Sequence, residues 1–214
     1  VWVKNKASKK KDKFVSDIYL TRLDIQEKDT FKTIQLTHSD ESDSSPLFSK
    51  DGEYIYFLSS REKGKKLWKM SIYGGEAKEV KEFENGISSL QWQNENTLLF
   101  QSKEGLSLHE KTLKEAKDDV IIVEDSTHWK PSRVYAYDLK TKAIKRVTTN
   151  KKPLSGYTIS LDGNWMIYKM TRSTSYDTDA QKDPFNFLLN MTTGEVTQII
   201  TDRGFPSGSF KFST

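Results

Sequence analysis

The sequence predicts an all-β fold built from repeated four-stranded antiparallel units, and three observations support this. The pattern Ser-x-x-Phe-Ser-x-Asp-Gly within residues 45–57, followed by a β-rich arm, returns in related form at 155–168. Apolar residues make up only 35% of the 214 residues and aromatic residues 12%, which favours strands that bury one face. Strands of alternating polarity, each ending in a turn, follow these copies.

Each unit begins with a hairpin. Asp51-Gly52 and Asp162-Gly163 stand between β-rich arms, so we expect two-residue hairpin turns there. A degenerate copy occupies residues 89–100. Residues 207–214 begin the pattern again but end before its Asp-Gly. From this last copy we expect the chain to be a piece of a longer protein.

The third and fourth strands of each unit follow the hairpin. The alternating third strands are expected at Asp17–Leu23, Leu67–Ile72, Val134–Leu139 and Phe185–Asn190. The polar fourth strands are expected at Lys32–Thr37, Ala77–Lys81, Ile144–Thr148 and Val196–Ile200. Four strands per unit, repeating at intervals above about 40 residues, are typical of β-propeller blades. The polar strand should be the outermost one, because charged side chains discourage pairing at an open edge.

The predicted fold is therefore an all-β β-propeller of four-stranded antiparallel blades, present as a partial arc of about four blades. We expect one domain over 1–214, with a partial first blade at 1–40, a second at 41–84, a third at 85–150, a fourth at 151–202 and the start of a fifth at 203–214. A smaller sandwich or a capped arc is the alternative, since an open arc leaves blade faces uncovered.

Two segments interrupt the repeat. Residues 4–15 contain six lysines and are interpreted as a solvated basic loop between two strands, because no aromatic residues alternate with the lysines as in nucleic-acid sites. The third blade carries an insertion at 103–131, with a short helix expected near 107–117. Long loops on regular scaffolds often carry specificity, so His128 and Trp129 are candidate substrate-gating residues. Packing of the insertion against a partner domain is an equal alternative.

Composition excludes several classes of function. The chain has 34 basic and 30 acidic residues, a net charge of +4 that does not indicate nucleic-acid binding. It has no cysteine, which excludes disulfides and thiolate metal sites. No apolar run reaches the roughly 20 residues that span a membrane. The compartment stays open between a bacterial cytoplasm and the periplasm or exterior.

The Ser-Pro-x-Phe-Ser-x-Asp-Gly signature, with its Leu-Trp-x-Met strand and Gly-Gly-Glu turn, resembles the TolB-like propeller repeat. The third-blade segments Glu115–Asp125 and Trp129–Leu139 are similar to the N-terminal propeller of prolyl oligopeptidase-type serine peptidases, of the acylaminoacyl-peptidase and dipeptidyl-peptidase-like branches. This resemblance implies a C-terminal α/β-hydrolase domain, absent from this chain, that cleaves peptides while the propeller filters them by size.

No catalytic residue is expected in this chain. It contains no Gly-x-Ser-x-Gly nucleophile elbow, and His38, His109 and His128 belong to no recognisable triad motif. Some members of the resembled family hold the substrate amino terminus with adjacent glutamates, and no Glu-Glu pair occurs here. We expect no cofactor and no metal.

Arg61 and Arg172 follow the two Asp-Gly turns at the same distance. Guanidinium groups suit bidentate binding of a substrate carboxylate, so both are candidate gating residues. The alternative is that each serves the loop of its own blade, because binding sites usually break a repeat. The acidic stretches Asp40–Asp43 and Tyr176–Asp179 lack the spacing of calcium loops and are interpreted as solvated turns.

Three functions remain in consideration. The first is the non-catalytic propeller portion of a serine peptidase, with the hydrolase domain and peptide substrates as partners and homo-oligomerisation left open. The second is a TolB-like module that binds proteins in a bacterial envelope assembly. The third is a propeller attached to a metal-dependent amidohydrolase. The third-blade insertion favours the first.

Overall fold

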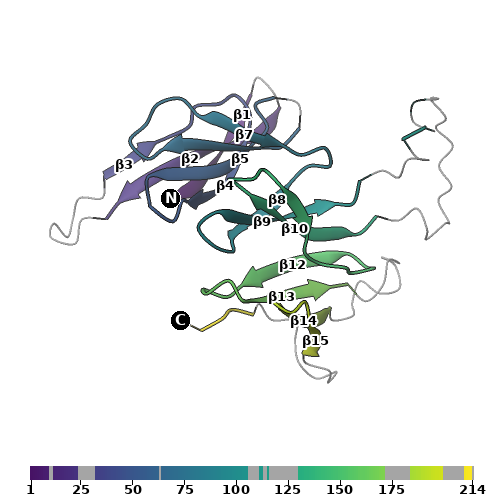
Figure 1. Ribbon diagram of the computed structural model, residues 1–214. Helices are drawn as coiled ribbons and strands as arrows, with labels where there is room; N and C mark the ends of the chain where they lie inside the picture. Colours follow the sequence, from purple (N-terminus) through teal and green to yellow (C-terminus); the bar gives the residue numbers. More distant parts are fainter. Residues whose placement is uncertain are drawn as a thin grey trace. The chain divides into compact units, whose positions relative to one another are not determined.

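The computed structural model describes residues 1–9, 12–23, 32–62, 64–105, 111–112, 115, 130–171, 184–199 and 210–213. Within them the chain forms four antiparallel sheets (Figure 1). It divides into two compact units, residues 1–90 and 91–214, and the boundary falls inside one strand, β8.

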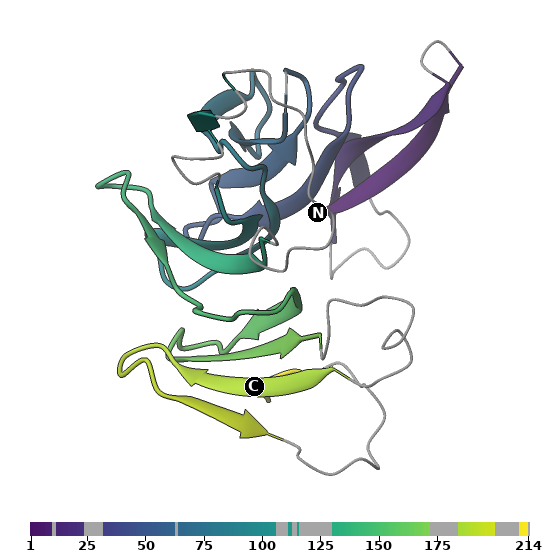
Figure 2. The same cartoon turned by 90° about the vertical axis from the view of Figure 1, so that its right-hand side faces the viewer.

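The first unit contains two sheets. The first sheet has the strand order β1 (Trp2–Ser8), β2 (Lys13–Arg22), β3 (Lys32–Gln35), and the second has the order β4 (Asp43–Phe48), β5 (Tyr54–Ser59), β6 (Lys66–Ser71), β7 (Lys78–Glu82). Figure 2 shows β1 and β2 as one long purple hairpin. Every neighbouring pair is antiparallel and consecutive in the chain.

The other two sheets have the same topology. The third contains β8 (Ser88–Trp92), β9 (Thr97–Lys103), β10 (Ser132–Asp138) and β11 (Ile144–Arg146), and the fourth contains β12 (Leu154–Ile159), β13 (Trp165–Met170), β14 (Phe185–Asn190) and β15 (Val196–Ile199). The outer strands β7, β11 and β15 are mostly exposed, as the sequence predicts. The prediction of an all-β protein with four-stranded antiparallel sheets is thus confirmed.

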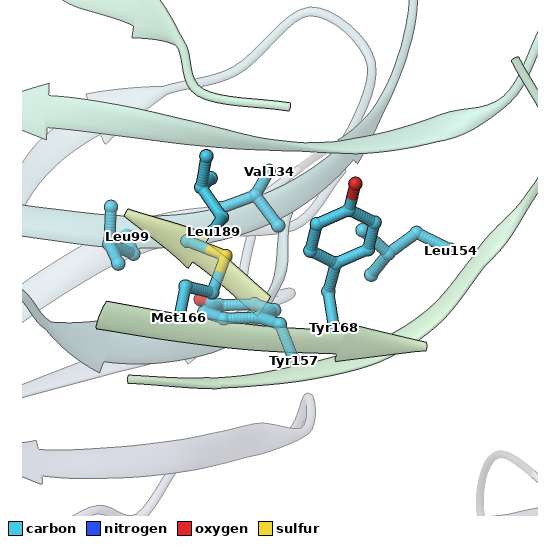
Figure 3. Close-up of a cluster of buried hydrophobic side chains, with 7 residues drawn as sticks. All are labelled: Leu99, Val134, Leu154, Tyr157, Met166, Tyr168 and Leu189. Carbon is cyan, nitrogen blue, oxygen red and sulfur yellow. The ribbon is translucent and has the colours of Figure 1, made fainter. Parts of the chain in front are cut away.

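Each unit has its own apolar core. In the first unit the core side chains come from the facing sheets and are Ile18, Leu36, Ile55, Phe57, Trp68 and Met70. In the second they are Leu99, Val134, Leu154, Tyr157, Met166, Tyr168 and Leu189 (Figure 3). Burying a large apolar side chain stabilises by about 1.5–3 kcal/mol, so these clusters hold the sheet pairs together.

The repeated Ser-x-Asp-Gly sequence has a defined local role. The Ser49 hydroxyl donates to Asp51 at 2.5 Å and accepts the Tyr54 amide at 2.9 Å. The Ser160 hydroxyl makes the same two contacts, to Asp162 at 2.5 Å and from the Trp165 amide at 2.9 Å. These hydroxyl hydrogen bonds lower the pKa of both aspartates from 3.8. The motif therefore builds a turn and does not mark a site.

The turns are longer than the sequence predicts. Ser49 pairs with Tyr54 through its backbone amide at 2.8 Å, so four residues form the loop and not two. Gly52 alone in that loop has a positive φ, +76°, which a two-residue type I′ turn would require at both central positions. The serine side chain accounts for the difference, because it bridges the loop and stabilises the longer turn.

The interpretation of residues 4–15 as a basic loop is wrong. Most of this segment belongs to β1 and β2, which pair in continuous register from Trp2↔Tyr19 to Ser8↔Lys13. Lys6 contacts the buried carboxylate of Asp17 at 2.6 Å, and Lys4 lies over the Tyr19 ring. Lysine-rich sequence is compatible with a strand at a sheet edge, where charge discourages further pairing.

Candidate functional site

Arg61 is the one candidate gating residue among those the structure describes, and it lies just after β5. Its Nε donates to the Ser59 hydroxyl at 2.8 Å, and its Nη2 donates to the Asp43 carboxylate at 2.9 Å. Ser59 and Asp43 are fully buried and stand opposite each other in the β4–β5 pairing. Arg61 therefore anchors the start of β4 to the end of β5.

Two aromatic rings hold the Arg61 guanidinium. It lies over Trp68 at 4.7 Å and over Phe57 at 5.5 Å from the ring centres, both within cation–π range. Only 24% of the Arg61 side chain is exposed. These contacts favour the interpretation that Arg61 serves its own sheet. Carboxylate binding by Arg61 stays a prediction.

The interpretation of Asp40–Asp43 as a solvated turn is wrong for Asp43. Its carboxylate is completely buried and paired with Arg61 because β4 begins at this residue and turns the side chain inward. Among the described residues, the other oxygen of this carboxylate has no hydrogen-bond partner. A buried carboxylate is expensive without a cation, so the arginine is required for this arrangement.

The other candidate residues, Arg172, His128 and Trp129, lie outside the described residues, as do Tyr176–Asp179 and most of the 103–131 insertion. Across the part of the chain that the structure describes, no three His, Asp or Glu residues gather as metal ligands would. The same residues include no helix long and apolar enough to cross a bilayer.

Each unit also carries a surface groove that the sequence does not predict. The groove in the first unit has a volume of about 230 Å³ and is lined by Leu20, Arg22, Lys32, Ile34, Ile72 and Tyr73. The groove in the second unit has about 240 Å³ and is lined by Ser155, Gly156, Tyr157, Thr158, Ile167, Lys169 and Phe210. In the second groove Lys169 lies over the Phe210 ring at 5.7 Å. The first groove therefore presents two cations and the second only one, which is already in contact with an aromatic ring.

Burial also perturbs one tyrosine beside the second groove. The Tyr157 side chain lies in the core of the second unit, and this burial raises the pKa of its phenol above the usual 10.0. The phenol therefore stays neutral at physiological pH, and its role is packing.

No protein-family model matches the chain. Among curated proteins, the chain is 25% identical over 198 residues to the uncharacterized peptidase YuxL of Bacillus subtilis. That match covers 86% of this chain but only 29% of the relative, so the chain spans less than a third of the protein it resembles.

Solved structures show the fold. Acylaminoacyl peptidase of Pyrococcus horikoshii matches with a TM-score of 0.57 and 20% identity over 92% of this chain and 30% of its own. TolB from Acinetobacter baumannii matches with a TM-score of 0.51 and 16% identity over 78% of this chain and 34% of its own. The chain thus has the β-propeller fold of these proteins, and by sequence it is similar to a segment of a peptidase.

Proposed function

We propose that this chain is the non-catalytic propeller portion of a longer serine peptidase, where it restricts and shapes the access of peptides to an α/β-hydrolase active site. One observation carries the proposal: 86% of the chain matches a peptidase, yet it accounts for only 29% of that protein. Since the chain lacks a Gly-x-Ser-x-Gly motif, the nucleophile belongs to the remaining part.

The physical basis of such a role is rigidity. Antiparallel sheets joined by short, hydrogen-bonded turns form a stable frame, and loops on that frame select what passes. In the third sheet the connection between β9 (Thr97–Lys103) and β10 (Ser132–Asp138) is far longer than the other hairpin turns. It contains His128 and Trp129, which we propose as contacts for the peptide together with Arg172.

A fluorophosphonate probe tests the proposal, because it reacts with an activated serine. Applied to the longer gene product, it should label one serine outside residues 1–214, and peptide hydrolysis should be lost with the labelling. The 214-residue chain alone should take no label and hydrolyse no peptide. A labelled serine within 1–214, or a longer product without any labelled serine, would contradict the proposal.

The contribution of the insertion is tested in the same longer protein. Replacing His128 and Trp129 with alanine should change kcat/KM for long peptides more than for a dipeptide ester, because only long substrates reach the propeller. Lys50→Gln, a change at an exposed turn lysine, is the matched control. Equal effects on long and short substrates would contradict a filtering role.

A second candidate function is a protein-binding propeller like TolB, favoured by the structural match to TolB. It predicts a longer product with no labelled serine that retains a protein partner on affinity capture. The same probe experiment therefore separates the two functions.

A further inference from the structure

The groove of the first unit, hereafter the Arg22–Lys32 groove, has an apolar floor and a cationic rim. In the β2–β3 pairing, Leu20 stands opposite Ile34 and Arg22 opposite Lys32. Directly opposed residues share one face of a sheet, so the two apolar side chains lie together and the two cations lie together beside them. Ile72 and Tyr73, which follow β6, complete the lining.

The two cations are not neutralised within the described residues. Like charges directly opposite each other destabilise a strand pair. Other lysines of the described chain, such as Lys6, Lys13 and Lys66, contact carboxylates at 2.5–3.5 Å. Neither Arg22 nor Lys32 has such a contact among the described residues. Among the described residues, the rim thus presents two positive charges that an anion would stabilise.

The apolar floor is firmly supported and yet accessible. Leu20 and Ile72 pack against the core of the first unit. Ile34 is 41% exposed and Tyr73 is 73% exposed, so apolar surface remains open to solvent. The Tyr73 amide donates to the Ser71 hydroxyl at 3.2 Å, which fixes the turn that carries the ring.

We propose that the Arg22–Lys32 groove binds the C-terminal residue of a peptide when that residue is apolar. The α-carboxylate pairs with Arg22 and Lys32, and the side chain of the same residue covers Leu20, Ile34 and Tyr73. Within a peptide, only the C-terminal residue carries both an α-carboxylate and an apolar side chain. This combination fits the groove, because each cation stands two residues along its strand from an apolar residue of the floor. A volume of about 230 Å³ suits one large residue and not an extended segment. Arginine favours such carboxylates because its planar guanidinium donates two parallel hydrogen bonds.

Fluorescence anisotropy on the 214-residue chain tests this, with an N-terminally labelled peptide that ends in Ala-Phe-Leu. The peptide with a free carboxylate should bind at least about 10-fold tighter than its C-terminal amide, and higher salt should weaken it. Arg22→Gln and Lys32→Gln should each weaken binding about 5-fold, and Tyr73→Ala by a similar factor. Lys50→Gln should have no effect.

Several results would overturn the inference. They are equal binding of the acid and the amide, no saturable binding of the acid in the millimolar range, and equal effects of Lys50→Gln and Arg22→Gln. A variant with Asp24, Glu27 and Asp29 changed to amides should bind as tightly or more tightly, and lost binding would also contradict us. Circular dichroism of each variant verifies folding. Because the experiment measures binding and not hydrolysis, its outcome is independent of the proposed peptidase function.

Discussion

Gly163 provides the sharpest test of how the repeated turns are fitted into the fold. Both Asp-Gly glycines have positive φ, +76° at Gly52 and +74° at Gly163. Their surroundings differ. A Cβ on Gly52 would meet none of the described residues within 4 Å, whereas a Cβ on Gly163 would lie closer than 3.0 Å to the backbone oxygen of Gln93. Replacement by alanine therefore introduces only backbone strain at Gly52, but both backbone strain and a steric clash at Gly163.

The expected costs follow from these two terms. A left-handed φ destabilises the folded state of a non-glycine residue by about 1–2 kcal/mol. Alanine also restricts the unfolded chain, and this offsets about 0.4–1 kcal/mol of that loss. Gly52→Ala should thus destabilise by about 1 kcal/mol. Gly163→Ala adds the displacement of the Gln93 carbonyl, an overpacking cost of about 1–3 kcal/mol, for a total of about 3 kcal/mol. The Gln93 backbone cannot move away easily, because its amide donates a hydrogen bond to the Thr97 carbonyl at 3.0 Å.

Urea and thermal denaturation of the two variants measure the difference. A loss of 1 kcal/mol lowers Tm by about 2–4 °C in a chain of this size, so Gly163→Ala should lower it by about 6–12 °C. Gly194→Ala is the control within the second unit, since Gly194 has φ +76° and a Cβ there would meet no described residue within 4 Å. If Gly163→Ala costs no more than Gly52→Ala and Gly194→Ala, the close approach of Gln93 is refuted.

Three further predictions concern the second unit. Lys142 has φ +63° at the position where the corresponding turn of the fourth sheet has Gly194. Lys142→Gly should therefore raise the free energy of unfolding, measured in urea, by about 0.5 kcal/mol, whereas the control Lys140→Gly should not raise it. Burial raises the folded-state pKa of Tyr157 above 10.0, so above about pH 10 the unfolded state loses this proton first, and the free energy of unfolding should fall by about 1.4 kcal/mol per pH unit. Tyr157→Phe should reduce that slope in alkaline denaturation. An unchanged slope would exclude Tyr157 as its source. The side-chain amide of Gln91 donates to the Tyr157 carbonyl at 2.9 Å and accepts the Ile159 backbone amide at 3.1 Å. Gln91→Ala should therefore lower the stability by about 1–2 kcal/mol in thermal denaturation. An unchanged Tm would show these bonds to be dispensable.

Local features of the fold were predictable from sequence, and long-range contacts were not. The strand Phe185–Asn190 matches its prediction at both ends, because alternation and turn residues are local signals. The Arg61–Asp43 pair depends on which residues of β4 and β5 stand opposite each other, and no local pattern shows this. The bonds of Gln91 to residues 66 and 68 positions later depend on the packing of one sheet against the next. The lysine density of residues 4–15 is not a loop signal, because the charge protects an edge strand from further pairing and does not end it.

The repeat also helps to distinguish structural residues from functional ones. The backbone amide of Ile18 donates to the Thr37 hydroxyl at 2.9 Å, and that of Val134 donates to the Thr148 hydroxyl at 3.0 Å. Ile18 in β2 and Val134 in β10 are therefore equivalent positions of the repeat. Four residues beyond Val134, the Asp138 carboxylate accepts two amides of the next turn, as the Asn190 side chain does in the fourth sheet. Four residues beyond Ile18 stands Arg22, which has no acceptor to offer a turn. The cation thus replaces a structural side chain at a position where the fold favours an acceptor, and this departure from the repeat supports a binding role for the Arg22–Lys32 groove.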